Sequence, residues 1–481
     1  MDALTLVPPV AAILIAVFAR NVYAALIAAL FLSESLIDGF NPILGALGAI
    51  DRTVAVFESG YNTQILLFCL LIGALIAFMR DSGGVAAMAK ALISSGLAGT
   101  RRRAELAVAG TGSAIFIETN VSLLSAGVLG RPLYDAHGLS RERLAYIIDS
   151  TSAPISVILI LNAWGAYALG LVEVYEFESP NNIVFGSVPW NFYALITIAI
   201  VYFTVFTGKV FGPMAKADAR VEGGIEEAGP APTKARYMWL PLLIMVGSAL
   251  LFMFITGAGS MAAEAGVAST AEWLRTQFSA GHFSELGRCM TKGDGAKSIL
   301  WAITLAISVS GLMLLAERAM KGSELQDKAF KGIGEMVPLV TVLLLSIALG
   351  ASLRALGTGD YVSSIAAGSL PGFTVPAILF AAAGATSFMT GTSWGTYGIL
   401  VPIAMPLAQA LGIPPSLALA AVLGGGVFGD HCSPISDTTL IASVASGTEH
   451  LSHVRTQLPY ALFAALIAGG LYIIAGLLTV S

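Results

Sequence analysis

Residues 429–438 read Gly-Asp-His-Cys-Ser-Pro-Ile-Ser-Asp-Thr and interrupt an otherwise apolar stretch at 415–447. That stretch exceeds the roughly 20 apolar residues that a helix needs to cross a bilayer. Aspartate and proline within it predict a broken membrane helix, because non-helical backbone at membrane depth is tolerated only where protein or water surrounds it. A similar interruption, Asp-Ser-Thr-Ser-Ala-Pro-Ile-Ser at 149–156, lies within the apolar stretch 143–170. We therefore predict a membrane protein whose polar chemistry is concentrated at helix breaks.

The composition sets the class of the whole chain. Of its 481 residues, 56% are hydrophobic and only 11% are charged, whereas a soluble domain carries about 25% charged residues. This excludes a soluble enzyme, a disordered chain and a basic nucleic-acid-binding protein, so no nucleic acid is expected among the partners. We expect an all-α polytopic protein of the lipid bilayer with about ten transmembrane helices, at 3–19, 21–37, 61–80, 143–170, 189–211, 237–257, 297–316, 334–354, 415–447 and 456–480.

Lysine and arginine residues orient these spans, because cytoplasmic loops carry an excess of both. Basic clusters lie on each side of the Gly- and Ser/Thr-rich stretch 104–130, which predicts a re-entrant hairpin that enters and leaves on the cytoplasmic side. The stretch 373–408 is predicted to be a second hairpin, entering from the other face. This arrangement places 19 of the 25 basic residues in the cytoplasm and both termini outside. The expected location is the inner membrane of a bacterium.

The two halves of the sequence resemble each other, since Asp149 and Pro154 in the first correspond to Asp430 and Pro434 in the second. The charge pattern gives the halves opposite orientations. Inverted repeats of this kind are a transporter construction, with the site near the membrane midplane where helices are broken. The predicted division is residues 1–212 (hairpin 104–130, broken helix 143–170), a cytoplasmic linker at 213–236, and residues 237–481 (hairpin 373–408, broken helix 415–447).

Acidic residues in the apolar segments are the first site candidates. An aspartate at the centre of a membrane helix costs about 2.5–3.5 kcal/mol by insertion scales. Each carboxylate alone could simply accept hydrogen bonds from broken backbone, but a set that recurs in both halves favours a cation or proton site. The deep candidates, all in interrupted segments, are Glu118, Asp149, Asp430 and Asp437.

Amide and hydroxyl side chains at the hairpin tips and breaks complete the predicted site, because oxygen atoms suit an alkali cation. Each hydroxyl alone is weak, since Ser and Thr in membrane helices often bond back to their own helix. His431 could equally be a proton relay or a packing residue. The Na⁺ candidates are Asn120, Asp149, Thr392, Asp430 and Asp437. The full ion- or substrate-binding set is Glu118, Thr119, Asn120, Ser122, Asp149, Thr151, Ser152, Thr390, Thr392, Ser393, Asp430, His431, Ser433, Ser436 and Asp437.

The segment 429–439 resembles the NhaC-type sodium/proton antiporter family of the wider ion-transporter superfamily, and the segments 391–396, 455–460 and 148–154 strengthen the likeness. The resemblance implies exchange of Na⁺ (or Li⁺) for H⁺ by alternating access. The hairpin-bearing halves would move against a scaffold, no cofactor would be needed, and analogy with the wider group implies a homodimer.

Two alternatives stay open. Relatives of this family carry organic acids or amino acids, so the chain could be a Na⁺-coupled transporter of a small organic anion or amino acid. An intramembrane aspartyl-type enzyme would use paired aspartates for acid–base chemistry. However, Val427 stands where the presenilin-type Gly-x-Gly-Asp motif requires glycine, and no His-Glu-x-x-His run exists. We therefore expect a transporter without catalytic residues.

Overall fold

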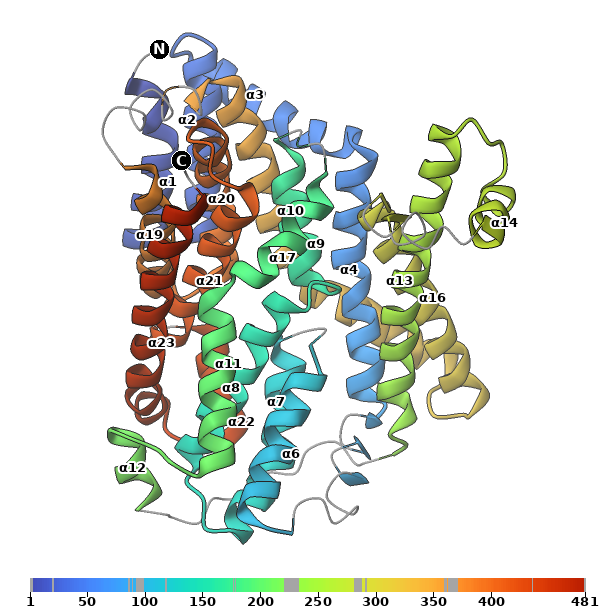
Figure 1. Cartoon of the computed structure of the whole chain (residues 1–481), viewed down its shortest axis with the longest axis vertical. Coiled ribbons are helices and arrows are strands. Elements are labelled where there is room, and N and C mark those ends of the chain that lie inside the picture. Colours follow the sequence, from blue (N-terminus) through green and yellow to red (C-terminus); the bar gives the residue numbers. More distant parts are fainter. Residues whose placement is uncertain are drawn as a thin grey trace.

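The protein is all-helical, as the composition predicts. The computed structural model describes residues 3–479 except positions 20, 85–86, 89, 92–98, 117–118, 176, 178, 220–232, 281–287, 290–291, 359–360, 362–370 and 435. No strand occurs among these described residues. The first half contains α1 (Val7–Ala19), α2 (Val22–Ile37), α3 (Pro42–Ala55), α4 (Gly60–Asp81), α6 (Arg101–Ala114), α7 (Thr119–Ala136), α8 (Arg141–Ile158), α9 (Ala163–Glu173), α10 (Pro180–Ser187), α11 (Phe192–Thr207) and α12 (Pro213–Asp218) (Figure 1). The second half contains α13 (Arg236–Glu264), α14 (Thr270–Ala280), α16 (Gly295–Ala316), α17 (Gly322–Ala355), α19 (Val375–Thr390), α20 (Ser393–Ala410), α21 (Pro415–Cys432), α22 (Asp437–Ser446) and α23 (His450–Thr479).

Membrane-spanning capacity is spread over both halves. Among the described residues, six helices are individually long and apolar enough to cross a bilayer, namely α4, α13, α16, α17, α19 with the turn before it, and α23. Three bent pairs qualify jointly, so the count rises to nine if each pair is one span. These pairs are α2–α3 (117°), α8–α9 (43°) and α10–α11 (43°). The expected ten crossings stay a prediction.

Both stretches that were predicted to be re-entrant hairpins contain two consecutive helices that pack against each other, while their re-entry stays a prediction. Helices α6 and α7 pack against each other, as do α19 and α20. The second hairpin turns at Gly391, whose φ of 70° is readily adopted by glycine. Helix α7 also packs against α22, and α20 against α9, so each hairpin contacts the broken helix of the other half. The order of hairpin and interrupted helix is the same in both halves, while their inverted relation stays a prediction.

Glycine allows the hairpin of the second half to lie directly on its broken helix. A side chain at Gly425 would collide with the main-chain oxygen of Phe380, and one at Gly429 with that of Gly384. The Gly-rich run before Asp430 therefore lets α21 pack closely on α19. This close contact fixes the position of the end of α21, where the polar break begins, relative to α19.

The first helix break lies later in the chain than predicted. Residues 149–156 are helical within α8, and the chain breaks between Ile158 and Ala163. Hydroxyls in this part of α8 bond back to carbonyls of their own helix, which accommodates polar residues without a break. Asn162 sets the break instead, because its side-chain oxygen accepts the N–H groups of Trp164 and Gly165 and so caps α9.

The other predicted interruptions are shorter than the sequence pattern indicates. Helix α21 ends at Cys432 and α22 begins at Asp437, so the break lies within 429–438 as predicted. Helices α7 and α20 begin at Thr119 and Ser393, which places the polar residues after these positions in first helical turns.

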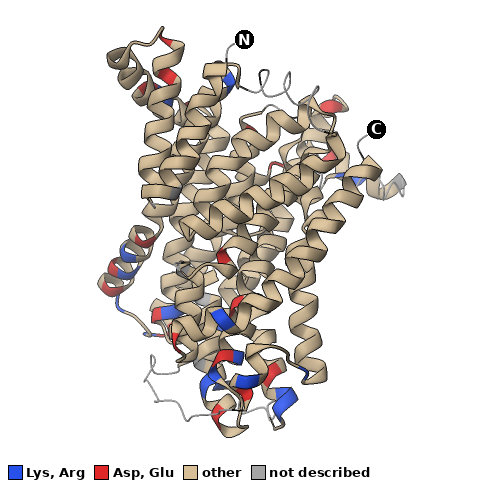
Figure 2. Cartoon of the chain, turned by 90° about the vertical axis from the view of Figure 1, so that its left-hand side faces the viewer, with Lys and Arg blue, Asp and Glu red and all other residues tan. Residues whose placement is uncertain are grey.

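Charge is distributed unevenly along the long axis. Lys and Arg residues gather at the end of the molecule opposite to both termini, interspersed with Asp and Glu residues (Figure 2). Helix α12, from the predicted linker, packs there against α8 and α23. We refer to this end, which contains α12 with Lys216 and the start of α8 with Arg141 and Arg143, as the basic end.

Candidate functional site

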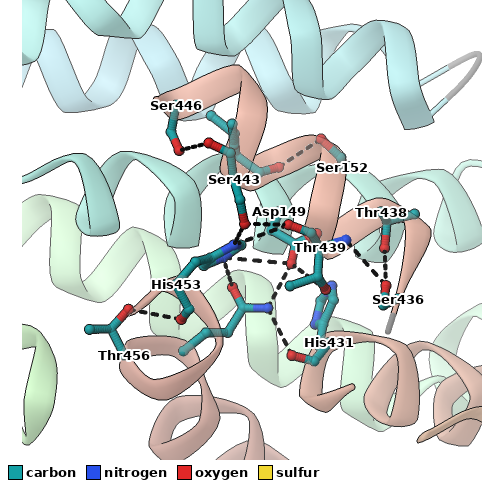
Figure 3. A network of polar contacts seen from close by, with 12 residues as sticks. Asp149, Ser152, His431, Ser436, Thr438, Thr439, Ser443, Ser446, His453 and Thr456 are labelled. Carbon is teal, nitrogen blue, oxygen red and sulfur yellow. Dashed lines mark hydrogen bonds and ion pairs between the residues drawn. The ribbon is translucent and has the colours of Figure 1, made fainter. Parts of the chain in front are cut away.

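Asp149 of α8 lies within a buried polar network between α8, α22 and α23 (Figure 3). Its side chain is fully buried. Its Oδ2 atom accepts hydrogen bonds from Gln457 Nε2 at 2.6 Å and from Thr439 Oγ1 at 3.3 Å. His453 Nε2 lies 3.8 Å from the same oxygen, while Oδ1 has no hydrogen-bond partner among the described residues. Among the residues that the structure describes, no Lys or Arg side chain forms an ion pair with Asp149.

Asp430, the corresponding residue of the second half, is also fully buried. Ser393 Oγ, from the first turn of α20, donates to Asp430 Oδ2 at 2.9 Å. The Thr439 hydroxyl lies 3.3 Å from the main-chain oxygen of Asp430 and also 3.3 Å from Asp149 Oδ2. Its single proton can be donated to only one of these oxygens at a time. Thr439 therefore bridges the two residues.

A cavity of about 470 Å³ lies between the tips of the two hairpins. Asn120 from the first hairpin and Thr390 and Thr392 from the second line it, so the structure brings together tip residues from both halves. Trp164 and Trp394 form one wall, with ring centroids 4.6 Å apart. Thr392 precedes Ser393, so the polar contacts continue from the cavity wall to Asp430.

Several predicted ligands hold the surrounding backbone in place. Thr119 Oγ1 accepts from Trp164 Nε1 at 3.1 Å, and Ser436 Oγ accepts the N–H of Thr439 and caps α22. Four further predicted ligands bond through their hydroxyls to main-chain oxygens, namely Ser122, Thr151, Ser152 and Ser433. The hydroxyls of Ser122 and Ser152 also lie 2.8 Å apart.

His431 lies beside the network. Its Nδ1 atom is 3.1 Å from the hydroxyl of Tyr193, and its main-chain oxygen accepts from Gln457 Nε2 at 3.0 Å. Two predicted acids cannot be placed in the same way: Glu118 lies outside the described residues, and for Asp437 only the backbone, at the start of α22, is described.

The sequence reasoning did not include His453, Thr439 or Glu335 in the site. His453 and Gln457 are four residues apart on α23, and this spacing puts both on one helix face. The helical spacing, next to the recognised segment 455–460, was a signal that could have identified His453. Glu335 of α17 lines the cavity from outside the hairpins, and nothing local in the sequence indicates that position.

The buried network favours competition between cations. An ionised carboxylate without a basic partner is costly inside a protein, so it tends to be neutralised by a proton or a bound cation. Asp149 has an unpartnered buried oxygen, and neighbouring hydroxyl, amide and carbonyl oxygens are hard ligands. Two discontinuous helices that pack against two helical hairpins, with such a network between them, define a secondary active transporter.

The comparisons with known proteins identify the family. The model of the Na⁺/H⁺ antiporter family matches residues 144–477. This chain belongs to that family, which confirms the resemblance noted at 429–439. It is a multi-pass membrane protein and a secondary active antiporter, not an enzyme, and its family implies Na⁺ and H⁺ as the transported ions.

Individual relatives extend this result. An uncharacterized protein of Haemophilus influenzae is 31% identical over 98% of this chain and 90% of its own length. The malate-2H⁺/Na⁺-lactate antiporter of Bacillus subtilis is 34% identical over 36% of this chain and 38% of that protein. Among solved structures, the YdaH transporter of Alcanivorax borkumensis shares the fold, with a TM-score of 0.58 at 12% identity over 88% of this chain and 86% of that one.

Proposed function

We propose that this antiporter exchanges Na⁺ for H⁺, with Asp149 and Asp430 as the groups that bind the two ions alternately. The observation that carries the proposal is a pair of fully buried aspartates from the two halves, where the Thr439 hydroxyl lies 3.3 Å from the carboxylate of Asp149 and 3.3 Å from the main-chain oxygen of Asp430. Na⁺ would bind the ionised form of these carboxylates, whereas a proton removes that charge. Binding of one ion therefore excludes the other, and this exclusion couples their movement.

The hairpin-tip cavity is the proposed entrance for Na⁺. Asn120 and Thr392 offer oxygen atoms at its wall, and Ser393 leads from there to Asp430. The ion would pass next to Asp149, whose free Oδ1 atom provides a further ligand. Asp437 and Glu118 remain candidate ligands from the sequence.

The proposed orientation places the basic end in the cytoplasm of a bacterium and both termini outside. The gathering of Lys and Arg at the end opposite to the termini supports it (Figure 2). Residues 1–212 and 237–481 would be the inverted repeats, and a homodimer in the inner membrane is the proposed assembly.

Purified protein in liposomes that contain a pH-sensitive dye tests the exchange. An inward Na⁺ or Li⁺ gradient should drive protons out of wild-type vesicles, and Asp149→Asn and Asp430→Asn should each reduce the initial rate about 100-fold or more. Asp51→Asn, which changes an exposed acid on α3, is the matched control and should retain the wild-type rate. The absence of Na⁺- or Li⁺-dependent proton movement by the wild type at every pH would overturn the proposal.

A second candidate function is Na⁺- or H⁺-coupled transport of a small organic solute. The volume of the cavity favours it, because about 470 Å³ far exceeds the space that a sodium ion fills. Among the described lining residues none is Lys or Arg, and Trp164 and Trp394 present aromatic rings. Glu335 is acidic, but its carboxylate already pairs with Arg80 of α4 at 2.9 Å, so a solute would share it with that guanidinium group. Ammonium and guanidinium groups bind such surroundings well, so an amino acid fits better than an organic anion.

Thermal-shift measurements with amino acids, amines and dicarboxylates, each with and without Na⁺, test this second function. A positively charged amino acid should raise the melting temperature of the wild type. Glu335→Gln should reduce that shift, whereas Asp51→Asn should keep it. Stabilisation by dicarboxylates alone would contradict the assignment of an amine-bearing solute.

A further inference from the structure

Four charged side chains of alternating sign connect the end of α4 to the first half of α17. Arg80 Nη1 and Nη2 donate to the two carboxylate oxygens of Glu335 at 2.9 Å and 3.1 Å. Arg80 Nε donates to Asp81 Oδ1 at 2.8 Å, and Lys328 Nζ lies 3.1 Å from Asp81 Oδ2. A two-pronged contact between guanidinium and carboxylate is a directional form of ion pair. Arg80 therefore holds the carboxylate of Glu335 in a defined position.

The same carboxylate belongs to the hairpin-tip cavity, which Glu335 lines from α17. The side chain of Glu335 is 36% exposed and that of Arg80 is 30% exposed, so water reaches both groups. A partly exposed ion pair gains little free energy over its separated ions, because water screens the charges. Glu335 can therefore be paired with Arg80 from α4 or with a cation in the cavity, and the preference between the two is small.

Arg80 keeps an opposite charge beside it when it leaves Glu335. Its Nε atom already donates to Asp81, the next residue of α4. A cation in the cavity would compensate Glu335, while Asp81 would compensate Arg80. An uncompensated charge would oppose such an exchange, and this arrangement of partners avoids one.

Helix α17 can bend at the turn that carries Glu335. Gly332 lies so close to Gly73 of α4 that a side chain at either position would collide with the main-chain oxygen of the other, so the two helices are held together at this crossing. Beyond it, Pro338 lines the cavity and has no N–H group to donate to the main-chain oxygen of Gly334. A missing helical hydrogen bond of this kind permits a bend, and the Arg80 contact bears on the same turn.

We propose that Arg80 competes with cations in the hairpin-tip cavity for the carboxylate of Glu335, and that its displacement loosens the turn of α17 that contains Glu335. This inference rests on the proposed entry of cations into that cavity, and it names the residue that sets their affinity. A neutral or anionic group cannot replace a guanidinium group on a carboxylate, so the contact favours cationic groups.

Cation binding to the purified full-length protein tests the competition. Methylammonium chloride is the probe, potassium chloride keeps the ionic strength constant, and the shift in melting temperature gives the half-saturating concentration. Arg80→Gln should lower this concentration about fivefold, because the carboxylate loses its competitor. Glu335→Gln should raise it by a similar factor.

The double variant separates competition from simple charge repulsion. Once Glu335 is replaced by Gln, Arg80 has no carboxylate of the cavity to compete for. Arg80→Gln in that background should therefore change the half-saturating concentration less than about twofold. Equal tightening in both backgrounds overturns the inference, because Arg80 would then act only through its positive charge.

Arg236→Gln is the matched control. Arg236 pairs with Glu317 at 2.5 Å at an exposed position, and neither residue is among the described lining residues of the cavity. This variant removes the same charge from an ion pair elsewhere and should keep the wild-type half-saturating concentration.

Amide hydrogen exchange tests the effect on α17. Saturating methylammonium should speed the exchange of residues 332–340 in the wild type, and Arg80→Gln should show the faster exchange without the probe. Exchange that only slows when the probe binds would overturn the loosening, because the turn would then be held more firmly by the cation than by Arg80.

The outcomes are independent of the proposed ion exchange. A folded Arg80→Gln variant with a lower melting temperature and an unchanged half-saturating concentration overturns the inference, since the pair would then be a structural contact. Absence of methylammonium binding in every variant also overturns it. Failure of Na⁺/H⁺ exchange in wild-type liposomes would overturn the proposed function instead, and the binding measurements do not depend on that assay.

Discussion

Helix α8 carries two buried charge clusters that differ in how their charge is compensated. Arg143 forms ion pairs with Glu105 of α6 and with Asp218 of α12, the latter at 2.8 Å. Asp149 lies six residues further along, about 9 Å along the helix axis, and among the described residues its ion-pair contact is with a histidine.

This difference in charge compensation separates a cluster that holds helices together from one that can bind and release ions. Each charged group of the Arg143 cluster has an opposite charge beside it, so the cluster can hold α6, α8 and α12 together. A carboxylate that faces an imidazole can exchange a proton or a cation for its missing counter-charge. Position in the same helix is therefore no guide to role, whereas the balance of charge around each group is.

The largest expected effect is on the compensated cluster. Arg143→Met would leave the buried Glu105 without its ion-pair partner and take one of two arginine partners from the partly buried Asp218, and should lower the free energy of unfolding by about 3–5 kcal/mol. Arg101→Met removes an exposed partner of the same Asp218, 3.0 Å away, and should cost less than about 1 kcal/mol. Denaturant titration in detergent micelles measures both, and equal losses would remove the distinction between them.

The uncompensated cluster should respond in the opposite way. Asp149→Asn removes a buried charge yet keeps an oxygen that can accept from Gln457, so we expect a melting temperature equal to or above that of the wild type. The same variant should lose exchange activity. A substantially lower melting temperature would show that Asp149 is primarily a structural residue.

A smaller effect is expected where the cavity meets the carboxylates. Ser393→Ala removes the hydroxyl that donates to Asp430 and should weaken the apparent Na⁺ affinity about tenfold, in line with a hydrogen bond to a charged group. The Na⁺ dependence of the exchange rate measures this. Thr396→Val, which removes a hydroxyl bonded to its own helix, is the control and should leave the affinity unchanged.

The smallest effect concerns a third, exposed cluster. Lys234 Nζ donates to Glu317 at 2.7 Å, and together with Tyr237 and Arg236 this lowers the pKa of Glu317 from 4.5 to about 2. A lowered folded-state pKa gives stability that is present above the unfolded value and lost as the pH falls through about 2. Glu317→Gln should therefore leave the pH profile of exchange between about 6 and 9 unchanged. A shifted profile would assign this cluster to the transport cycle.

The second break lies where the sequence predicted it, because its signal is local. The re-entry of the two helix pairs into the membrane stays a prediction. A proline, a glycine or an aspartate within an apolar run disrupts a helix wherever the rest of the chain lies. The first break was misplaced for the same reason. Thr151 and Ser152 resemble helix breakers but bond back to their own helix, while the actual break follows Ile158 in an apolar run and depends on Asn162. Helix α3 was not predicted from the sequence. This helix follows a turn at Gly39 and Phe40, both with a φ of 67°.

By itself, the sequence determined the membrane class, the family, the unequal distribution of basic residues and the two aspartates, because each follows from composition or from a contiguous motif. Only the tertiary structure decided which polar groups meet. Thr439 bridges aspartates from different halves, His453 reaches Asp149 across more than 300 positions, and Glu335 enters the hairpin cavity from α17. These contacts depend on how α8, α17, α22 and α23 pack, and close packing is set by the shapes of all the helices together, not by any one segment.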